Sequence, residues 1–91
     1  MDERDSWTKR RAEQRLAEEL NRATAAFGAA SARVNEVAAD ALTFSLPYPD
    51  SMVQIQNVRT ENEVAFAKWR KAMDRWLAFV KEGVIPEDLG I

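Results

Sequence analysis

The stretch that decides the fold reads Thr43-Phe44-Ser45-Leu46-Pro47-Tyr48-Pro49-Asp50. Pro47 and Pro49 each disfavour the helical conformation in the residue before them, and neither fits a helix interior. On both sides of this break, apolar residues recur at spacings of three and four, which is typical of helices. Because a break of about eight residues between two long helices most simply reverses the chain, the sequence predicts an all-α fold. We expect an antiparallel two-helix hairpin, coiled-coil-like in its spacing.

The first helix is expected over residues 5–42, a stretch that contains no proline. Its middle is rich in alanine, the strongest helix former, and small side chains there would let a partner helix approach closely. The row of side chains that packs against the other helix is called the seam below. In the first helix we expect it to contain Leu16, Leu20, Ala23, Phe27, Ala30, Val34, Val37 and Ala41.

The second helix is expected over residues 51–82. Gly83 stands where a left-handed terminating residue belongs, and Pro86 follows shortly after it. Residues 83–91 then form a short apolar tail, so residues 1–91 make a single hairpin domain. The expected seam of this helix contains Met52, Ile55, Arg59, Asn62, Phe66, Trp69, Met73, Trp76 and Val80.

An antiparallel hairpin with this break predicts its own register. Residues that face each other across the seam should have numbers that sum to about 93. This rule places Phe27 beside Phe66 and Leu16 beside Trp76. Apolar side chains meet apolar side chains near both ends of the hairpin, which favours the arrangement.

The second helix carries more apolar surface than one partner helix can cover. Four further residues widen its stripe beyond the expected seam, namely Val58, Ala65, Ala72 and Phe79. Since small cores are marginal, we expect a second copy of the chain to cover the stripe and complete a four-helix bundle, or another protein to do so. The alternative is that the tail and the loop fold back over it. Val58 and Phe79 are the candidate partner-binding residues of this stripe.

Arg59 and Asn62 are polar residues within the expected seam, about one turn apart. A buried polar residue at such a position can fix the register or the oligomeric state of a helical bundle. Alternatively, Arg59 extends outward along its aliphatic stem and pairs with Glu36 or Glu63. The sequence leaves both readings open.

Basic residues gather at the open end of the predicted hairpin. Residues 7–15 hold four basic residues and one acid, and residues 64–81 hold five and one. Positive charge interleaved with aromatic residues is typical of a nucleic-acid binder or of a site for an acidic protein surface. Trp7 is either a partner-facing anchor or packs against the tail around Pro86. The candidate partner-binding residues here are Trp7, Arg10, Arg11, Lys68 and Lys71.

The residue types present make several kinds of chemistry improbable. There is no cysteine and no histidine, which excludes a thiolate zinc site, a cysteine nucleophile and a histidine base. We therefore expect no enzyme activity, no cofactor, no metal and no catalytic residue. No apolar run is long enough for a membrane span, and the charged first residues are unlike a signal peptide. A cytoplasmic protein without membrane contact is expected.

These observations together predict a non-catalytic protein-interaction or assembly module. It would be a small helical adaptor, inhibitor or structural subunit that binds another protein or itself, with a homodimer as the expected form. Nine arginines against four lysines, with abundant alanine, suggest a bacterial or phage source. The alternative function is a nucleic-acid-associated accessory protein that uses the basic open end.

Overall fold

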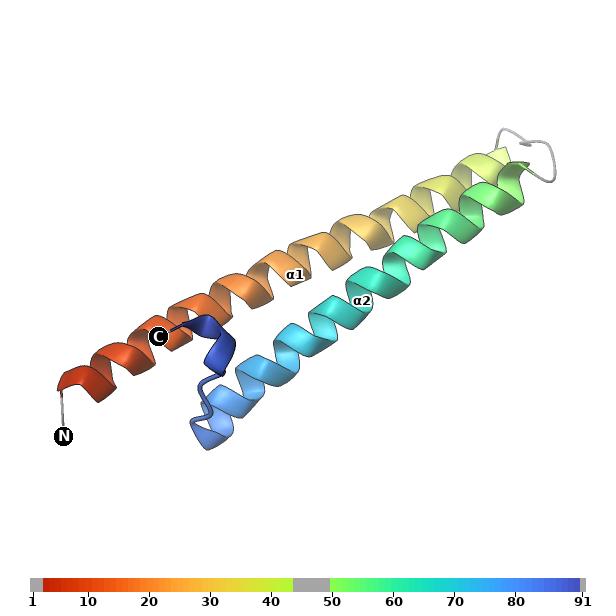
Figure 1. The fold of residues 1–91 in the computed structure, drawn as a ribbon. Helices are drawn as coiled ribbons and strands as arrows, with labels where there is room; N and C mark the ends of the chain where they lie inside the picture. Colours follow the sequence, from red (N-terminus) through yellow and green to blue (C-terminus); the bar gives the residue numbers. More distant parts are fainter. Residues whose placement is uncertain (1–2, 44–49, 91) are drawn as a thin grey trace.

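The structure is a computed structural model that describes residues 3–43 and 50–90, and side chains are described for residues 6–42 and 52–90. Helix α1 spans Glu3–Thr43, helix α2 spans Asp50–Glu82, and a short 3₁₀ helix, η1, spans Glu87–Leu89. The two long helices run antiparallel and contact each other, and they diverge toward the end of the hairpin that holds the termini (Figure 1). This part of the chain is therefore all-helical, and the predicted two-helix hairpin is confirmed. The molecule measures 65 × 20 × 16 Å.

The register follows the predicted pairing. The ring centroids of Phe27 and Phe66 lie 5.4 Å apart, edge to face. The Asn62 side-chain amide donates to the Ser31 hydroxyl at 2.9 Å. Arg33 lies 3.0 Å from Glu61 in an ion pair, one step off the rule. The rule that paired numbers sum to about 93 therefore holds in the middle of the hairpin.

The seam of α1 also agrees with the prediction. Leu16 is fully buried, and the other predicted seam residues, from Leu20 to Ala41, are half-buried. One buried residue was missed, because Ala12 lies one turn before Leu16 and is fully covered as well. Ala12 was not predicted because a small alanine between two charged residues adds little to an apolar pattern.

The expected seam of α2 is wrong by one column, where a column is a set of residues seven apart that lie above one another on a hairpin helix. Val58 is only 5% exposed and Ala72 is also buried, so these residues face α1. The observed seam contains Ile55, Val58, Asn62, Ala65, Trp69, Ala72, Trp76 and Phe79, which are all buried or half-buried. Their column of alanines lets the two helix backbones approach closely, which favours this rotation of α2.

Three of the candidate site residues change their assignment as a result. Arg59 is exposed and does not lie in the seam, and no ion pair with Glu36 or Glu63 is found among the described side chains. Val58 and Phe79 are not free flanking residues: Val58 lies between the helices, and Phe79 packs at the open end. Asn62 stays in the seam, as expected.

The chain leaves α2 at Gly83 and turns back. Gly83 has a φ of 71°, which is strained for any residue with a side chain, and its N–H donates to the Phe79 carbonyl at 2.9 Å. Residues 84–90 then run from the end of α2 toward α1 (Figure 1). This tail places Leu89 against Ala12 and Leu16, with Trp76 and Ile85 packed around them. The tail part of the alternative is thus confirmed at the open end. The loop residues Phe44, Leu46 and Tyr48, which are the other part of it, lie outside the described residues.

Candidate functional site

The tail is held in place by charged side chains. Arg75 donates to both carboxylate oxygens of Asp88, at 2.9 and 3.0 Å, and its Nε lies 3.1 Å from a carboxylate oxygen of Glu19. Arg15 donates to the Leu89 carbonyl at 2.7 Å. The hydrogen bonds from Arg75 lower the pKa of Asp88 below its ordinary value. The hydrogen bond to Asp88 and the charge of Glu19 in turn raise the pKa of Arg75. These contacts fasten the tail across both helices.

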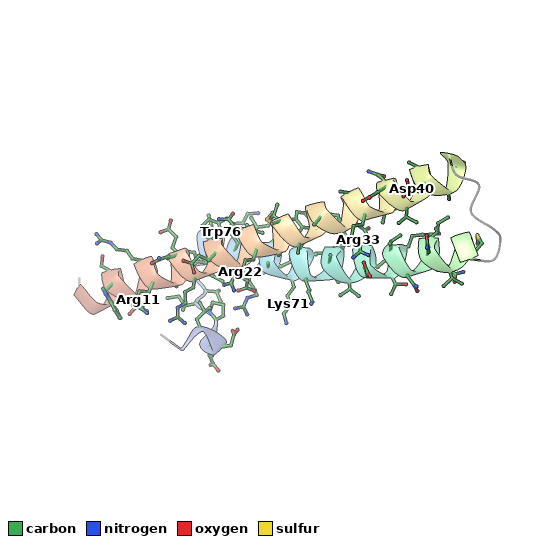
Figure 2. The ribbon with its side chains drawn as sticks, turned by 90° about the horizontal axis from the view of Figure 1, so that it is seen from above. Arg11, Arg22, Arg33, Asp40, Lys71 and Trp76 are labelled. Atoms are coloured by element: carbon green, nitrogen blue, oxygen red, sulfur yellow. The ribbon has the colours of Figure 1, made fainter. Side chains whose placement is uncertain are left out.

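The predicted basic patch is divided in the structure. Trp7 is 57% exposed and does not pack into the tail; the guanidinium of Arg11 lies over its ring, 4.8 Å from the centroid. Lys68 and Lys71 lie level with residues 22–25 of α1, which is about 16 Å along the helix from Arg11 at 1.5 Å per residue. Figure 2 shows Arg11 and Lys71 well apart along the hairpin. Trp7, Arg10 and Arg11 therefore do not form one surface with Lys68 and Lys71.

One side of the hairpin carries an open groove, called the basic groove below. Its floor consists of small side chains from both helices, among them Ala26, Ala29 and Ala65. Its rim carries Arg15, Arg22, Arg33, Lys68, Lys71 and Arg75 against Glu18, Glu19, Glu61 and Asp88. Among the described side chains, Arg22, Lys68 and Lys71 have no ion pair. Figure 2 shows Lys71 extending out beyond the ribbon.

The flank of the seam opposite the basic groove is called the apolar face. Phe66, Met73, Leu77 and Val80 of α2 lie on it, beside the seam residues Leu20 and Phe27 of α1. Phe66 is 41% exposed and Val80 is 57% exposed. Phe66 also forms an aromatic cluster with Phe27 and Trp69, whose ring centroids lie 5.4 to 5.9 Å apart. Apolar side chains thus recur along about four turns of this flank, with the exposed Arg70 among them.

The spacing along α2 shows that the two surfaces lie on opposite flanks of the seam. Val64 and Lys71 belong to the basic groove and precede the seam residues Ala65 and Ala72 by one position. Phe66 and Met73 follow the same seam residues by one position. Because successive residues of a helix are turned by about 100°, residues before and after a seam position lie on opposite flanks of it.

A metal site and a membrane-spanning helix are two further features that the described residues could form. Within them, no group of three or more side chains is placed to hold a metal ion. Of the helices described, none combines the length and the apolar character that crossing a bilayer requires. What the geometry does display is two long surfaces of different chemistry.

Comparison with known proteins adds no further constraint. The chain shows no significant match to a protein-family model, to a curated protein or to a solved structure.

Sequence reasoning missed the tail contacts and the basic groove. The heptad columns would have indicated the groove, since Lys68 and Arg75 are seven apart, as are Ala26 and Arg33. No local pattern links Arg75 to Asp88, because their contact depends on the turn at Gly83.

Proposed function

We propose that this protein is a non-catalytic interaction or assembly module that works by adding helices to the apolar face. The observation that carries the proposal is the exposure of this face beside a seam that is only half covered. Among the described residues, the buried hydrophobic ones are Ala12, Leu16, Val58, Ala72 and Leu89. Three of these five belong to the open end, so the middle of the hairpin has almost no core of its own.

The energetic argument concerns the large side chains of the apolar face. Full burial of a Leu, Phe, Met or Val side chain stabilises by about 1.5–3 kcal/mol relative to full exposure. Phe66, Leu77 and Val80 are roughly half-covered in the hairpin. Covering the rest would therefore contribute about 1 kcal/mol for each of them. Large exposed apolar side chains that recur along one flank of a helix favour an interaction site in a small protein.

The proposed form of the assembly is a four-helix bundle of two hairpins. One side of the hairpin, 65 Å by 20 Å, has a footprint of roughly 1,300 Å². A standard stable interface buries about 800 Å² on each partner, so a dimer needs most of the length of this side and not only the four turns of the apolar face. The proposal includes no chemistry, because its action is to hold helices together.

A matched pair of valines on α2 provides the test. Val80 lies on the apolar face and is 57% exposed, whereas Val64 lies in the basic groove and is 50% exposed. Val80→Glu should weaken association measured by light scattering at micromolar concentration, and Val64→Glu should leave it close to wild type. Equal effects of the two substitutions, with helix content unchanged by circular dichroism, would refute the proposed role of the apolar face.

A further inference from the structure

The two helices contribute columns of different size to the apolar face. From α2 comes a column of mostly large side chains, Met52, Arg59, Phe66, Met73 and Val80. From α1 comes a column of small ones, Ala17, Thr24, Ser31 and Ala38. Each set repeats every seven residues, directly beside the seam, so each column stays on one flank of its helix along the hairpin.

The observed register fixes the height of each column residue, which means its position along the long axis of the hairpin. The rule that facing numbers sum to about 93 places Thr24 level with a point between residues 66 and 73 of α2. In the same way, Ala17 is level with a point between residues 73 and 80, and Ser31 with one between 59 and 66. Every small residue of α1 thus stands at the height of a gap between two residues of the α2 column.

We infer that the apolar face is covered by a second copy of this chain, related by a two-fold axis parallel to the helices. This inference rests on the proposed function and specifies its partner. A rotation about such an axis keeps every residue at its own height and places α1 over the α2 of the other copy. The small column of each copy then fits between the large side chains of the other, as ridges fit into grooves.

The other symmetric arrangement lacks this fit. A two-fold axis perpendicular to the helices would place α1 on α1 and α2 on α2. The large side chains of Phe66, Met73 and Val80 would then face the large side chains of the other copy's α2. The small side chains of Thr24 and Ser31 would face small side chains of its α1. Both axes make every pair of neighbouring helices antiparallel, so the helix dipoles favour neither and the fit of the columns decides between them.

The half-buried polar pair marks the middle of the proposed interface. The Asn62 amide donates to Ser31 at 2.9 Å, and Ser31 belongs to the small column. Because the axis preserves heights, the two copies bring this pair to the same layer. A polar layer within the interface penalises shifted registers, which is the role that such residues have in helical bundles.

Salt distinguishes the two arrangements as well. The half of the chain nearer the turn, residues 23–63, holds five acids and two bases, whereas residues 1–22 and 64–91 hold ten acids and eleven bases. The parallel axis brings the two acidic turn halves side by side. Their repulsion is screened as ionic strength rises, so the dimer should tighten with added salt. The perpendicular axis would place each acidic turn half beside the nearly neutral open half of the other copy, so that dimer should depend little on salt.

The decisive experiment uses cross-linking, which the natural absence of cysteine makes unambiguous. Thr24→Cys and Met73→Cys proteins of different tag length are mixed and treated with a short bis-maleimide. The control mixture is Ala38→Cys with Met73→Cys, which lie at very different heights of the same face. Light scattering of the untreated wild type gives the mass in parallel.

We expect a mass of twice 10.3 kDa and a mixed cross-linked product in the first mixture but not in the control. A dimer that cross-links equally in both mixtures, or in neither, would overturn the parallel axis while leaving the proposed function intact. A monomeric mass would overturn the second copy as the partner. Because Val80→Glu and Val64→Glu would then behave alike in light scattering, a monomeric mass would also refute the proposed assembly of two hairpins, whereas the cross-linking outcomes test the axis alone.

Discussion

The open end and the middle of the hairpin differ in how the apolar side chains of the two helices are covered. At the open end, the tail returns and places Leu89 against Ala12 and Leu16, so the two helices and the tail share a small closed core. In the middle, only two helices are present, and aromatic residues such as Phe66 remain 41% exposed beside the seam. Two packed helices bury one flank each, and a third element is needed before a core closes.

This difference indicates where the proposed partner acts. The open end obtains its third element from the same chain, which costs no association entropy. The middle has no such element among the described residues, and in the proposed dimer the second copy supplies it. Changes to the closed core around Leu16 and Leu89 should therefore act at any protein concentration, whereas changes on the apolar face should act through association.

The largest effect is expected from removing the centre of the closed core. Leu16→Ala should lower the free energy of unfolding by about 2–5 kcal/mol, because it leaves a cavity beneath Leu89. Urea denaturation at fixed protein concentration measures this loss. A loss below about 1 kcal/mol would mean that the open end is not closed as the structure has it.

A smaller effect is expected when the tail loses its ionic contacts. Arg75→Ala removes both hydrogen bonds to Asp88 and the ion pair with Glu19, while Arg15 still reaches the Leu89 carbonyl. Amide exchange at Gly90 should become faster, with the helix content unchanged. Lys68→Ala, a basic residue of the groove without an ion pair, serves as the control and should leave this exchange rate as it is.

The tail should also respond to acid. Its contact with Arg75 lowers the folded-state pKa of Asp88 below the unfolded value. The stabilisation is therefore complete above the ordinary carboxyl pKa and is lost as pH falls through the lowered pKa of the folded state. Amide exchange at Gly90, corrected for its intrinsic pH dependence, should report this loss in wild type and not in Asp88→Asn. The same acid response in the variant would assign it to another carboxylate.

The smallest effect concerns the basic groove. Arg22, Lys68 and Lys71 have no ion pair among the described side chains, but Glu18 lies on the same rim. We expect duplex and single-stranded DNA to bind no more tightly than the weak non-specific range at physiological salt, with affinity falling steeply as salt rises. A mobility shift compares wild type with an Arg22→Glu, Lys68→Glu, Lys71→Glu variant. Tight binding that the variant abolishes would favour the nucleic-acid function instead.

Much of the fold could be predicted from local patterns. The two prolines, the spacing of three and four and the length of the break were sufficient for two helices, and the register followed from the position of the turn. The rotation of α2 could not be predicted in this way, since two neighbouring columns are both largely apolar. Hydrophobicity favours the column with Phe66 and Met73, whereas close approach of two backbones favours the column with Ala65 and Ala72.

The surfaces were less accessible to sequence reasoning. The prediction was wrong by one column on α2, so it placed Val58 beside the seam and Phe66 within it, whereas the structure has the reverse. The apolar stripe beside the seam is present, but it consists of the residues of the neighbouring column. The docking of Leu89 depends on a turn that redirects seven residues, and no periodic pattern spans so short a tail.

The measurement that tests the central claim most directly is the dependence of the urea midpoint on protein concentration. If a second chain completes the core in the middle, the wild-type midpoint must rise with concentration by mass action. Phe66→Glu should abolish most of this dependence, while Val64→Glu should preserve it. A wild-type midpoint that stays constant from the low to the high micromolar range would contradict the account, because the hairpin would then be complete by itself.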